Sequence, residues 1–209
     1  MSKINTIKTE MSEYWENQYK TNNIKWDIGG PTPVFNNWIA KLKKKYLICV
    51  LGSGNGWDAV NFAKYGHTVT AVDFAETAVN NTRLLAKKHG VYINILKENI
   101  FDLDSNYNNY FDIVLEYTCF CAIPISHRTY YIELVNRILK NNGELVALLF
   151  PIEKKINNNS PPYSIELNLT IKLFENYFTL IECFKSRYSI IPRKDKEIFV
   201  IFKKDANKN

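Results

Sequence analysis

Short apolar runs alternate along this chain with stretches of helical periodicity. The apolar runs predict strands, and the first of them, YLICVL, suits a strand buried on both faces of a sheet. These strands are predicted at residues 46–51, 68–72, 92–96, 111–115, 144–150, 178–184 and 197–202. Helices are predicted over 9–20, 34–44, 56–65, 75–88, 128–139 and 165–176. Because strands and helices alternate, we predict βαβ units and a mostly parallel sheet.

The chain length favours one domain. The sequence has 209 residues, of which 46% are hydrophobic and 23% charged, which is ordinary for a globular protein with a sizeable core. No internal repeat and no linker interrupts the pattern. We therefore interpret residues 1–209 as a single domain.

The net charge of +6 changes this picture little. Basic residues cluster at 41–45 and in the tail from Arg193, but no basic stripe interleaves with aromatic residues as a nucleic-acid groove requires. We therefore expect no nucleic-acid partner. No apolar run approaches the ~20 residues of a membrane span, and the N-terminal segment contains no apolar signal core. We expect a cytoplasmic monomer with no membrane segment.

The spacing of cysteine and histidine does not indicate a metal site. The four cysteines form no CxxC pair and show no metal-ligand spacing with the three histidines. We expect reduced cysteines packed in the core and no bound metal. His67 is expected on the surface, and His89 suits the C-terminus of a helix. His127, near the mouth of the sheet, is the histidine with a candidate functional role.

The segment VLGSGNGWDAV joins the first predicted strand to a helix through three glycines. Gly52, Gly54 and Gly56 would let the backbone approach a ligand outside the carboxyl ends of the strands. The segment lacks the Gly-Lys-Ser/Thr of a P-loop, and its GxGxG spacing matches the GxGxxG dinucleotide fingerprint poorly. Asp73 ends the second strand, where a carboxylate can accept both hydroxyls of a ribose. NAD, S-adenosylmethionine, or a plain tight turn with a surface acid would each be compatible with these features.

Three later segments extend the pattern of the glycine turn and Asp73. KENIFD (97–102) follows the third strand, FDIVLEY (111–117) forms the fourth, and LKNNGELVALLF (139–150) leads into the fifth. Together these features resemble class I S-adenosylmethionine-dependent methyltransferases. The resemblance implies a Rossmann-like α/β sandwich with a seven-stranded sheet, helices on both faces and an antiparallel final strand. It also implies S-adenosylmethionine as the cofactor and S-adenosylhomocysteine as its product.

Segments toward the two ends narrow the resemblance. They are WENQY (15–19), WDIGGPTP (26–33), EYTCFCAI (116–123), FPIEKKINNNSPPY (150–163) and IPRKDKE (191–197). They are similar to signatures of the thiopurine S-methyltransferase superfamily, and closest to its thiol and halide methyltransferase branch. The similarity runs from about Trp15 to Glu197. It implies that residues 1–45 form a helical cap over the cofactor site.

The resemblance also implies roles for individual residues. The residues expected to bind the cofactor are Trp15, Trp26, Gly52, Gly54, Gly56, Asp73, Asn99, Ile100 and Glu116. The candidates for the acceptor pocket are Tyr19, Tyr117, Cys119, His127 and Arg193. Glu116 stands where the family commonly has Asp, and Cys119 where it commonly has Phe, which would reshape the pocket. Arg193 would attract an anion, although a solvated surface charge explains it equally well.

The implied reaction is an in-line transfer of a methyl group to a small thiol, hydrosulfide or halide anion. A halide is always an anion and thiols ionise near or above neutral pH, so such acceptors need little or no general base. Proximity, alignment and removal of water would supply most of the rate. The alternatives are a thiopurine-type aromatic thiol methyltransferase, an NAD-dependent oxidoreductase, and a protein that binds S-adenosylmethionine without turning it over.

Overall fold

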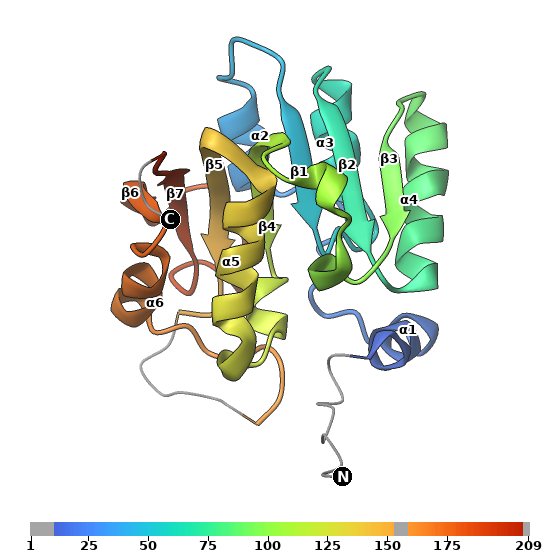
Figure 1. The fold of residues 1–209 in the computed structure, drawn as a ribbon. Helices are drawn as coiled ribbons and strands as arrows, with labels where there is room; N and C mark the ends of the chain where they lie inside the picture. The colour runs from blue at the N-terminus through green and yellow to red at the C-terminus, as the bar shows by residue number, and fades with distance from the viewer. Residues whose placement is uncertain (1–10, 153–158, 207–209) are drawn as a thin grey trace, which may run out of the picture.

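A seven-stranded sheet forms the centre of the structure, a computed structural model in which residues 11–152 and 159–206 are described (Figure 1). The strands are β1 (Leu47–Leu51), β2 (Thr68–Asp73), β3 (Asn94–Lys97), β4 (Phe111–Tyr117), β5 (Leu139–Leu149), β6 (Phe178–Phe184) and β7 (Ile198–Lys204). Their order is β3-β2-β1-β4-β5-β7-β6. Strands β1 to β5 pair in parallel, and β7 runs antiparallel to both of its neighbours. The predicted sheet with an antiparallel final strand is confirmed.

Helices cover both faces of this sheet. They are α1 (Ser12–Lys20), α2 (Pro33–Ile39), α3 (Trp57–Lys64), α4 (Glu76–His89), α5 (Arg128–Ile138) and α6 (Leu167–Phe174). One hydrophobic cluster packs α5 and α6 against the sheet, and a second packs α2, α3 and α4 against the other face. Within β1, Cys49 and Leu51 belong to the first cluster, whereas Ile48 and Val50 belong to the second. This alternation confirms that β1 is buried on both faces.

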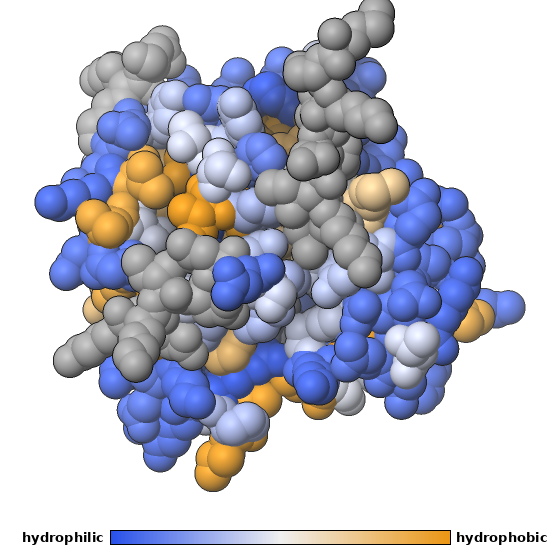
Figure 2. Space-filling model, turned by 90° about the horizontal axis from the view of Figure 1, so that it is seen from below, coloured by the Kyte–Doolittle hydropathy of each residue, from blue (hydrophilic) through white to orange (hydrophobic). Residues whose placement is uncertain are grey.

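The carboxyl ends of the strands meet at one edge of the sheet. In Figure 1 the arrowheads of β1 and β2 point down, and α1 lies below them. Figure 2 looks onto the molecule from this end, where hydrophilic residues dominate and hydrophobic residues form small groups. Among the described residues, no helix is long and apolar enough to cross a bilayer.

Some predicted element boundaries were wrong. The helix predicted over 34–44 ends at Ile39, before a run of lysines whose like charges disfavour a continued helix. Strand β5 begins at Leu139 rather than 144, because Leu139 already pairs with Phe111. Strand β3 begins at Asn94 rather than Tyr92, whose side chain is 85% exposed.

The predicted surface position of His67 was also wrong. His67 is buried, and its ring lies against Tyr46 and Phe62. Its Nδ1 accepts a hydrogen bond from the Tyr46 backbone N–H at 3.1 Å, and burial lowers the pKa of the imidazole. His89, as predicted, is the last residue of α4.

The cysteines only partly follow the prediction of a buried, reduced set. All four are free thiols; Cys49 and Cys121 are buried and Cys119 is half-buried. Cys183 is exposed on β6, the edge strand of the sheet. Among the described residues, no cluster of acidic, histidine and cysteine side chains could hold a metal ion.

Candidate functional site

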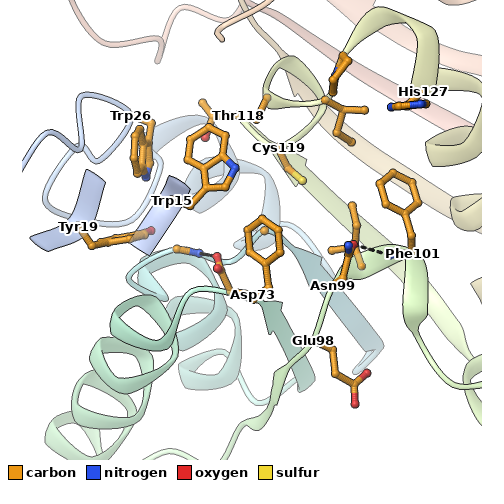
Figure 3. Close-up of a pocket in the computed structure, with 17 residues that line it drawn as sticks. Trp15, Tyr19, Trp26, Asp73, Glu98, Asn99, Phe101, Thr118, Cys119 and His127 are labelled. Carbon is orange, nitrogen blue, oxygen red and sulfur yellow. Dashed lines mark hydrogen bonds between the residues drawn. The ribbon is translucent and has the colours of Figure 1, made fainter. Parts of the chain in front are cut away.

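A cavity of about 420 Å³ opens at the carboxyl ends of the central strands (Figure 3). It receives residues from α1 and the loop that follows it, from the glycine turn, and from the segments after β2, β3 and β4. Its lining includes Trp15, Tyr19, Trp26, Gly52, Gly54, Asp73, Asn99, Ile100, Thr118, Cys119 and His127. The structure thus brings together ten of the predicted site residues, from segments that are far apart in the sequence.

The glycine turn presents bare backbone to this cavity. Gly52 and Gly54 line it and have φ angles of +59° and +56°, which disfavour any side chain. A Cβ at Gly52 would lie 2.8 Å from Cys119 Sγ, and one at Gly54 would lie 3.3 Å from Tyr19 Oη. Gly56 does not line the cavity; it is the N-cap of α3 and packs against Thr82.

Asp73 points into the cavity from the end of β2 (Figure 3). Its Oδ2 accepts a hydrogen bond from the Gly54 N–H, and its Oδ1 accepts one from the Ala75 N–H, each at 2.9 Å. Burial raises the pKa of this carboxyl to about 6, although the backbone hydrogen bonds oppose the shift. The carboxylate is therefore fixed in place and is ionised at neutral pH, as an acceptor for vicinal hydroxyls must be.

The segment after β3 forms another wall of the cavity. Asn99 caps a short 3₁₀ helix, and its Oδ1 accepts a hydrogen bond from the Phe101 N–H at 3.1 Å. Ile100 follows with a buried apolar side chain. An amide edge beside an apolar surface can hold a flat heterocycle. His127 also lies at this end of the cavity, well away from Trp15 and Trp26 (Figure 3).

Aromatic rings from the N-terminal segment wall the opposite end. The rings of Trp15 and Trp26 meet edge to face with centroids 5.3 Å apart, and Tyr19 meets Trp26 at 5.6 Å. Burial and the charge of Asp73 raise the pKa of the Tyr19 hydroxyl, so it stays neutral. Electron-rich faces of this kind attract a cation.

Three carboxylates that were not among the predicted site residues connect these aromatic residues to the rest of the site. Asp27 accepts hydrogen bonds from side chains of the glycine turn and α3, including Trp57 Nε1 at 3.0 Å. Asp58 accepts from the N–H and hydroxyl of Thr32 at 2.8 and 2.7 Å. Glu16 accepts from Thr77 on α4. In the sequence, these acidic residues stand close to the tryptophans and glycines of the motifs, and that position is the signal that could have identified them.

A second cavity, of about 480 Å³, shares four residues with the first: Trp15, Trp26, Thr118 and Ala122. The rest of its described lining is aromatic, proline-rich and basic. It includes Tyr14, Gln18, Asn23, Lys25, Cys121, Phe150, Pro161, Pro162, Pro192, Arg193 and Lys196. No aspartate or glutamate occurs among these described lining residues, although three side chains are cationic. The second cavity therefore favours an anion.

Arg193 is the most confined of these cations, and its interpretation as a solvated surface charge is wrong. It is 5% exposed, and its guanidinium lies 5.0 Å from the ring centroid of Tyr117 and 5.2 Å from that of Phe150. Its Nη2 donates to the Trp26 carbonyl at 2.6 Å. Its Nη1 is buried without a hydrogen-bond partner among the described residues. A buried cationic donor without a hydrogen bond lowers the stability of the fold unless a ligand accepts a hydrogen bond from it.

Besides Gly56, two predicted site residues, Glu116 and Tyr117, line neither of these cavities. Glu116 is 2% exposed, and its carboxylate accepts hydrogen bonds from the Phe120 N–H at 2.8 Å and the Tyr131 hydroxyl at 2.9 Å. Burial raises the pKa of Glu116 to about 7. The Tyr117 hydroxyl donates a hydrogen bond to Glu197 at 3.0 Å, and the Tyr117 ring packs against the Arg193 guanidinium. Both residues therefore support the site rather than face it.

The other candidates for the acceptor pocket divide between the two cavities. Tyr19, Cys119 and His127 line only the first cavity, and Arg193 lines only the second. Cys119 packs against Gly52, and burial raises the pKa of its thiol well above the usual value. The thiol is therefore neutral and unsuited to act as a nucleophile.

An acid at the end of β2, bare backbone in the turn before it, and an antiparallel strand next to the sheet edge define a class I S-adenosylmethionine-dependent methyltransferase. The methyltransferase that acts on 1,6-didemethyltoxoflavin in Burkholderia thailandensis, solved with S-adenosylhomocysteine bound, has this fold. It matches with a TM-score of 0.80 and 16% identity, over 98% of this chain and 92% of that one. A TehB-like methyltransferase from Corynebacterium glutamicum matches with a TM-score of 0.65 and 14% identity, over 93% of this chain and 98% of that one.

The chain belongs to the thiopurine S-methyltransferase (TPMT) family, whose model matches residues 10–205. A relative named "Probable thiol methyltransferase 2" in Arabidopsis thaliana is 28% identical over 92% of this chain and 85% of that protein. Thiocyanate methyltransferase 1 of Brassica oleracea is 27% identical, over 88% and 81%. Thiopurine S-methyltransferase of Francisella tularensis subsp. tularensis is 26% identical, over 82% of each chain. The predicted family is confirmed, and S-adenosylmethionine is its methyl donor.

Proposed function

We propose that the chain transfers the methyl group of S-adenosylmethionine to a small anionic acceptor, a thiolate, hydrosulfide or halide, bound in the second cavity. The observation that carries this proposal is Arg193 Nη1, which has no hydrogen-bond partner among the described residues and is buried in a cavity that shares Trp15 and Trp26 with the cofactor cavity. An anion bound by Arg193 would lie where the second cavity meets the cofactor cavity, beside Trp15, Trp26 and Thr118, which line both.

The cofactor cavity fits S-adenosylmethionine by its own features. Bare backbone at Gly52 and Gly54 leaves room that a Cβ would fill. The fixed carboxylate of Asp73 can accept the ribose hydroxyls, and Asn99 with Ile100 can flank the adenine. When bound, the cofactor supplies a methyl group activated by a sulfonium charge.

The aromatic wall and the second cavity then act on the donor and on the acceptor, respectively. The rings of Trp15 and Trp26 stabilise a cation at their faces and exclude water from it. Arg193, with Lys25 and Lys196 on the same cavity, raises the local concentration of anions. Holding the two reactants in adjoining cavities provides the proximity and alignment that an in-line displacement needs.

The described part of the second cavity offers no acidic or histidine side chain as a general base. Among the residues described there, none is histidine, aspartate or glutamate, and burial raises the pKa of the Cys121 thiol to about 12. Acceptors that ionise by themselves do not need a base, whereas an alcohol would. This absence of a base favours soft anions and thiols over hydroxyl acceptors.

Specific observations favour an aromatic thiol as a second candidate. The second cavity measures about 480 Å³ and is walled by Tyr14, Phe150 and three prolines, which would accommodate a ring. The relatives carry names that mention thiol, thiocyanate and thiopurine methylation, so both candidates lie within the family.

An acceptor panel tests the proposal. Purified protein and S-adenosylmethionine are incubated with iodide, chloride, hydrosulfide, thiocyanate, thiophenol or 6-mercaptopurine. S-adenosylhomocysteine and volatile methyl products are then measured. Saturable turnover with the small anions supports the proposal, and turnover only with the aromatic thiols supports the second candidate. Binding of S-adenosylhomocysteine with no turnover on any acceptor would indicate a protein that binds the cofactor without using it.

A further inference from the structure

Thr118 follows β4 at the point where the two cavities meet. Among the described residues, four line both cavities, and three of these offer aromatic or methyl surface, namely Trp15, Trp26 and Ala122. Thr118 is the one that carries a side-chain hydroxyl. It lies with the two tryptophans at the end of the cofactor cavity that is remote from His127 (Figure 3).

The backbone of Thr118 is strained. Its φ angle is +64°, a left-handed conformation in which a β-branched residue is a genuine outlier. The other described non-glycine residues with positive φ are Asn22, Asn109, Asn142 and Asp195. Asparagine and aspartate tolerate this conformation, so Thr118 alone in this described set bears the full steric cost. Glycine would relieve the strain, so the threonine side chain at this position carries a local conformational cost.

The surrounding contacts hold Thr118 in this conformation. On its N-terminal side, Tyr117 pairs with Leu148 of β5. On its C-terminal side, the chain turns at once into a short 3₁₀ helix whose Phe120 N–H donates to the buried carboxylate of Glu116. The Thr118 carbonyl accepts a hydrogen bond from Cys121 Sγ at 3.4 Å. Glu116 thus fixes the turn that presents Thr118, which explains a buried carboxylate that lines neither cavity.

We propose that the Thr118 hydroxyl is a specificity-determining contact, which donates a hydrogen bond to the acceptor atom that receives the methyl group. This inference rests on the proposed function. Arg193 would hold the anion from one side through Nη1, and Thr118 would orient it toward the donor from the boundary between the cavities. Two donors from separate segments fix the position of a spherical or single-atom nucleophile better than one.

Three variants test the contact. Thr118→Val keeps the shape and the strain but removes the hydroxyl, and we expect kcat/KM for the preferred anion to fall at least tenfold. Thr118→Ser keeps the hydroxyl and should stay within about threefold of wild type. Thr118→Gly removes both hydroxyl and strain, and should lose activity as Thr118→Val does while melting no lower than wild type. Asn142→Gly is the matched control, because Asn142 has φ +63° and is exposed on β5, and its activity should not change.

A binding measurement separates this inference from the proposed function. The Kd of thiocyanate for the S-adenosylhomocysteine complex is measured by tryptophan fluorescence, which requires no turnover. We expect Thr118→Val to raise this Kd at least fivefold and Thr118→Ser to change it less than twofold. If Thr118→Val had the same kcat/KM and the same thiocyanate Kd as the wild type, the proposed hydrogen bond from Thr118 to the acceptor would be ruled out. Absence of turnover in wild type, with a thiocyanate Kd that still depends on the hydroxyl, would overturn the proposed function alone.

Discussion

Replacing Arg193 by methionine removes the buried cation of the second cavity, leaves Lys25 and Lys196 in place, and keeps an unbranched apolar stem. The change should weaken the acceptor and leave the cofactor nearly untouched, because Arg193 lines only the second cavity. Among the described residues, Nη2 of the guanidinium bonds the Trp26 carbonyl and the buried Nη1 has no hydrogen-bond partner. The predicted loss is therefore that of one hydrogen bond to a charged partner.

Such a bond contributes about 1.5–3 kcal/mol, which corresponds to a rise of about 10- to 150-fold in KM for the anion. The Kd of S-adenosylhomocysteine should change less than about threefold, since only the Trp26 carbonyl loses a donor. The melting temperature should fall somewhat, because buried Glu197 loses a nearby positive charge. Arg193→Lys keeps the positive charge but not the planar guanidinium with its two terminal nitrogens, so it should recover only part of the lost anion affinity.

Initial rates against anion concentration, with calorimetric titration of S-adenosylhomocysteine, separate the two effects. Arg187→Met is the matched control, because the Arg187 guanidinium lies 5.0 Å from the Tyr188 ring, as Arg193 does from Tyr117. Arg187 lines a groove with α2 and β6 that shares no residue with the second cavity. An unchanged anion KM in Arg193→Met, or an equal rise in Arg187→Met, would rule out Arg193 as the group that binds the anion.

Three further predictions follow from the same geometry. Burial raises the pKa of Asp73 to about 6, so the affinity for S-adenosylhomocysteine should increase as the pH rises from 5 to 7. In calorimetric titrations, Asp73→Asn should weaken this binding and abolish its pH dependence. Gly56→Ala places a Cβ 2.5 Å from Thr82 Oγ1 at φ +79°, and should lower the free energy of unfolding in urea by about 1–3 kcal/mol. Adding Thr82→Ala should restore part of that loss, and full additivity would contradict the contact. Turnover with iodide should be flat above neutral pH, while turnover with a thiol of pKa about 8.5 should rise toward that pH; the same rise with iodide would indicate a general base.

Much of the fold was predictable because it depends on local patterns. Seven apolar runs became seven strands, and the glycine turn and Asp73 meet because the carboxyl ends of parallel strands share one edge. The aromatic wall was predictable only through the family resemblance. Nothing in the spacing of Trp15 and Trp26 indicates that their rings contact each other.

The errors and omissions at the site have physical causes. Side chains alternate across a strand, so Glu116 faces α5 and bonds Tyr131, whereas Tyr117 faces the opposite cluster and packs on Phe35. This alternation was available in the sequence. The burial of Arg193 was not, because its partner, the Trp26 carbonyl, lies 167 residues away in the chain.

The proposed reaction requires the cofactor and an anion to occupy two adjoining cavities that share Trp15 and Trp26. A crystal structure with S-adenosylhomocysteine and iodide tests it most directly, because iodide is located by its anomalous scattering. We expect the cofactor product against Asp73, and iodide in the second cavity within hydrogen-bond distance of Arg193 Nη1. Iodide found only at surface lysines, with the second cavity empty beside a bound cofactor product, would contradict the account.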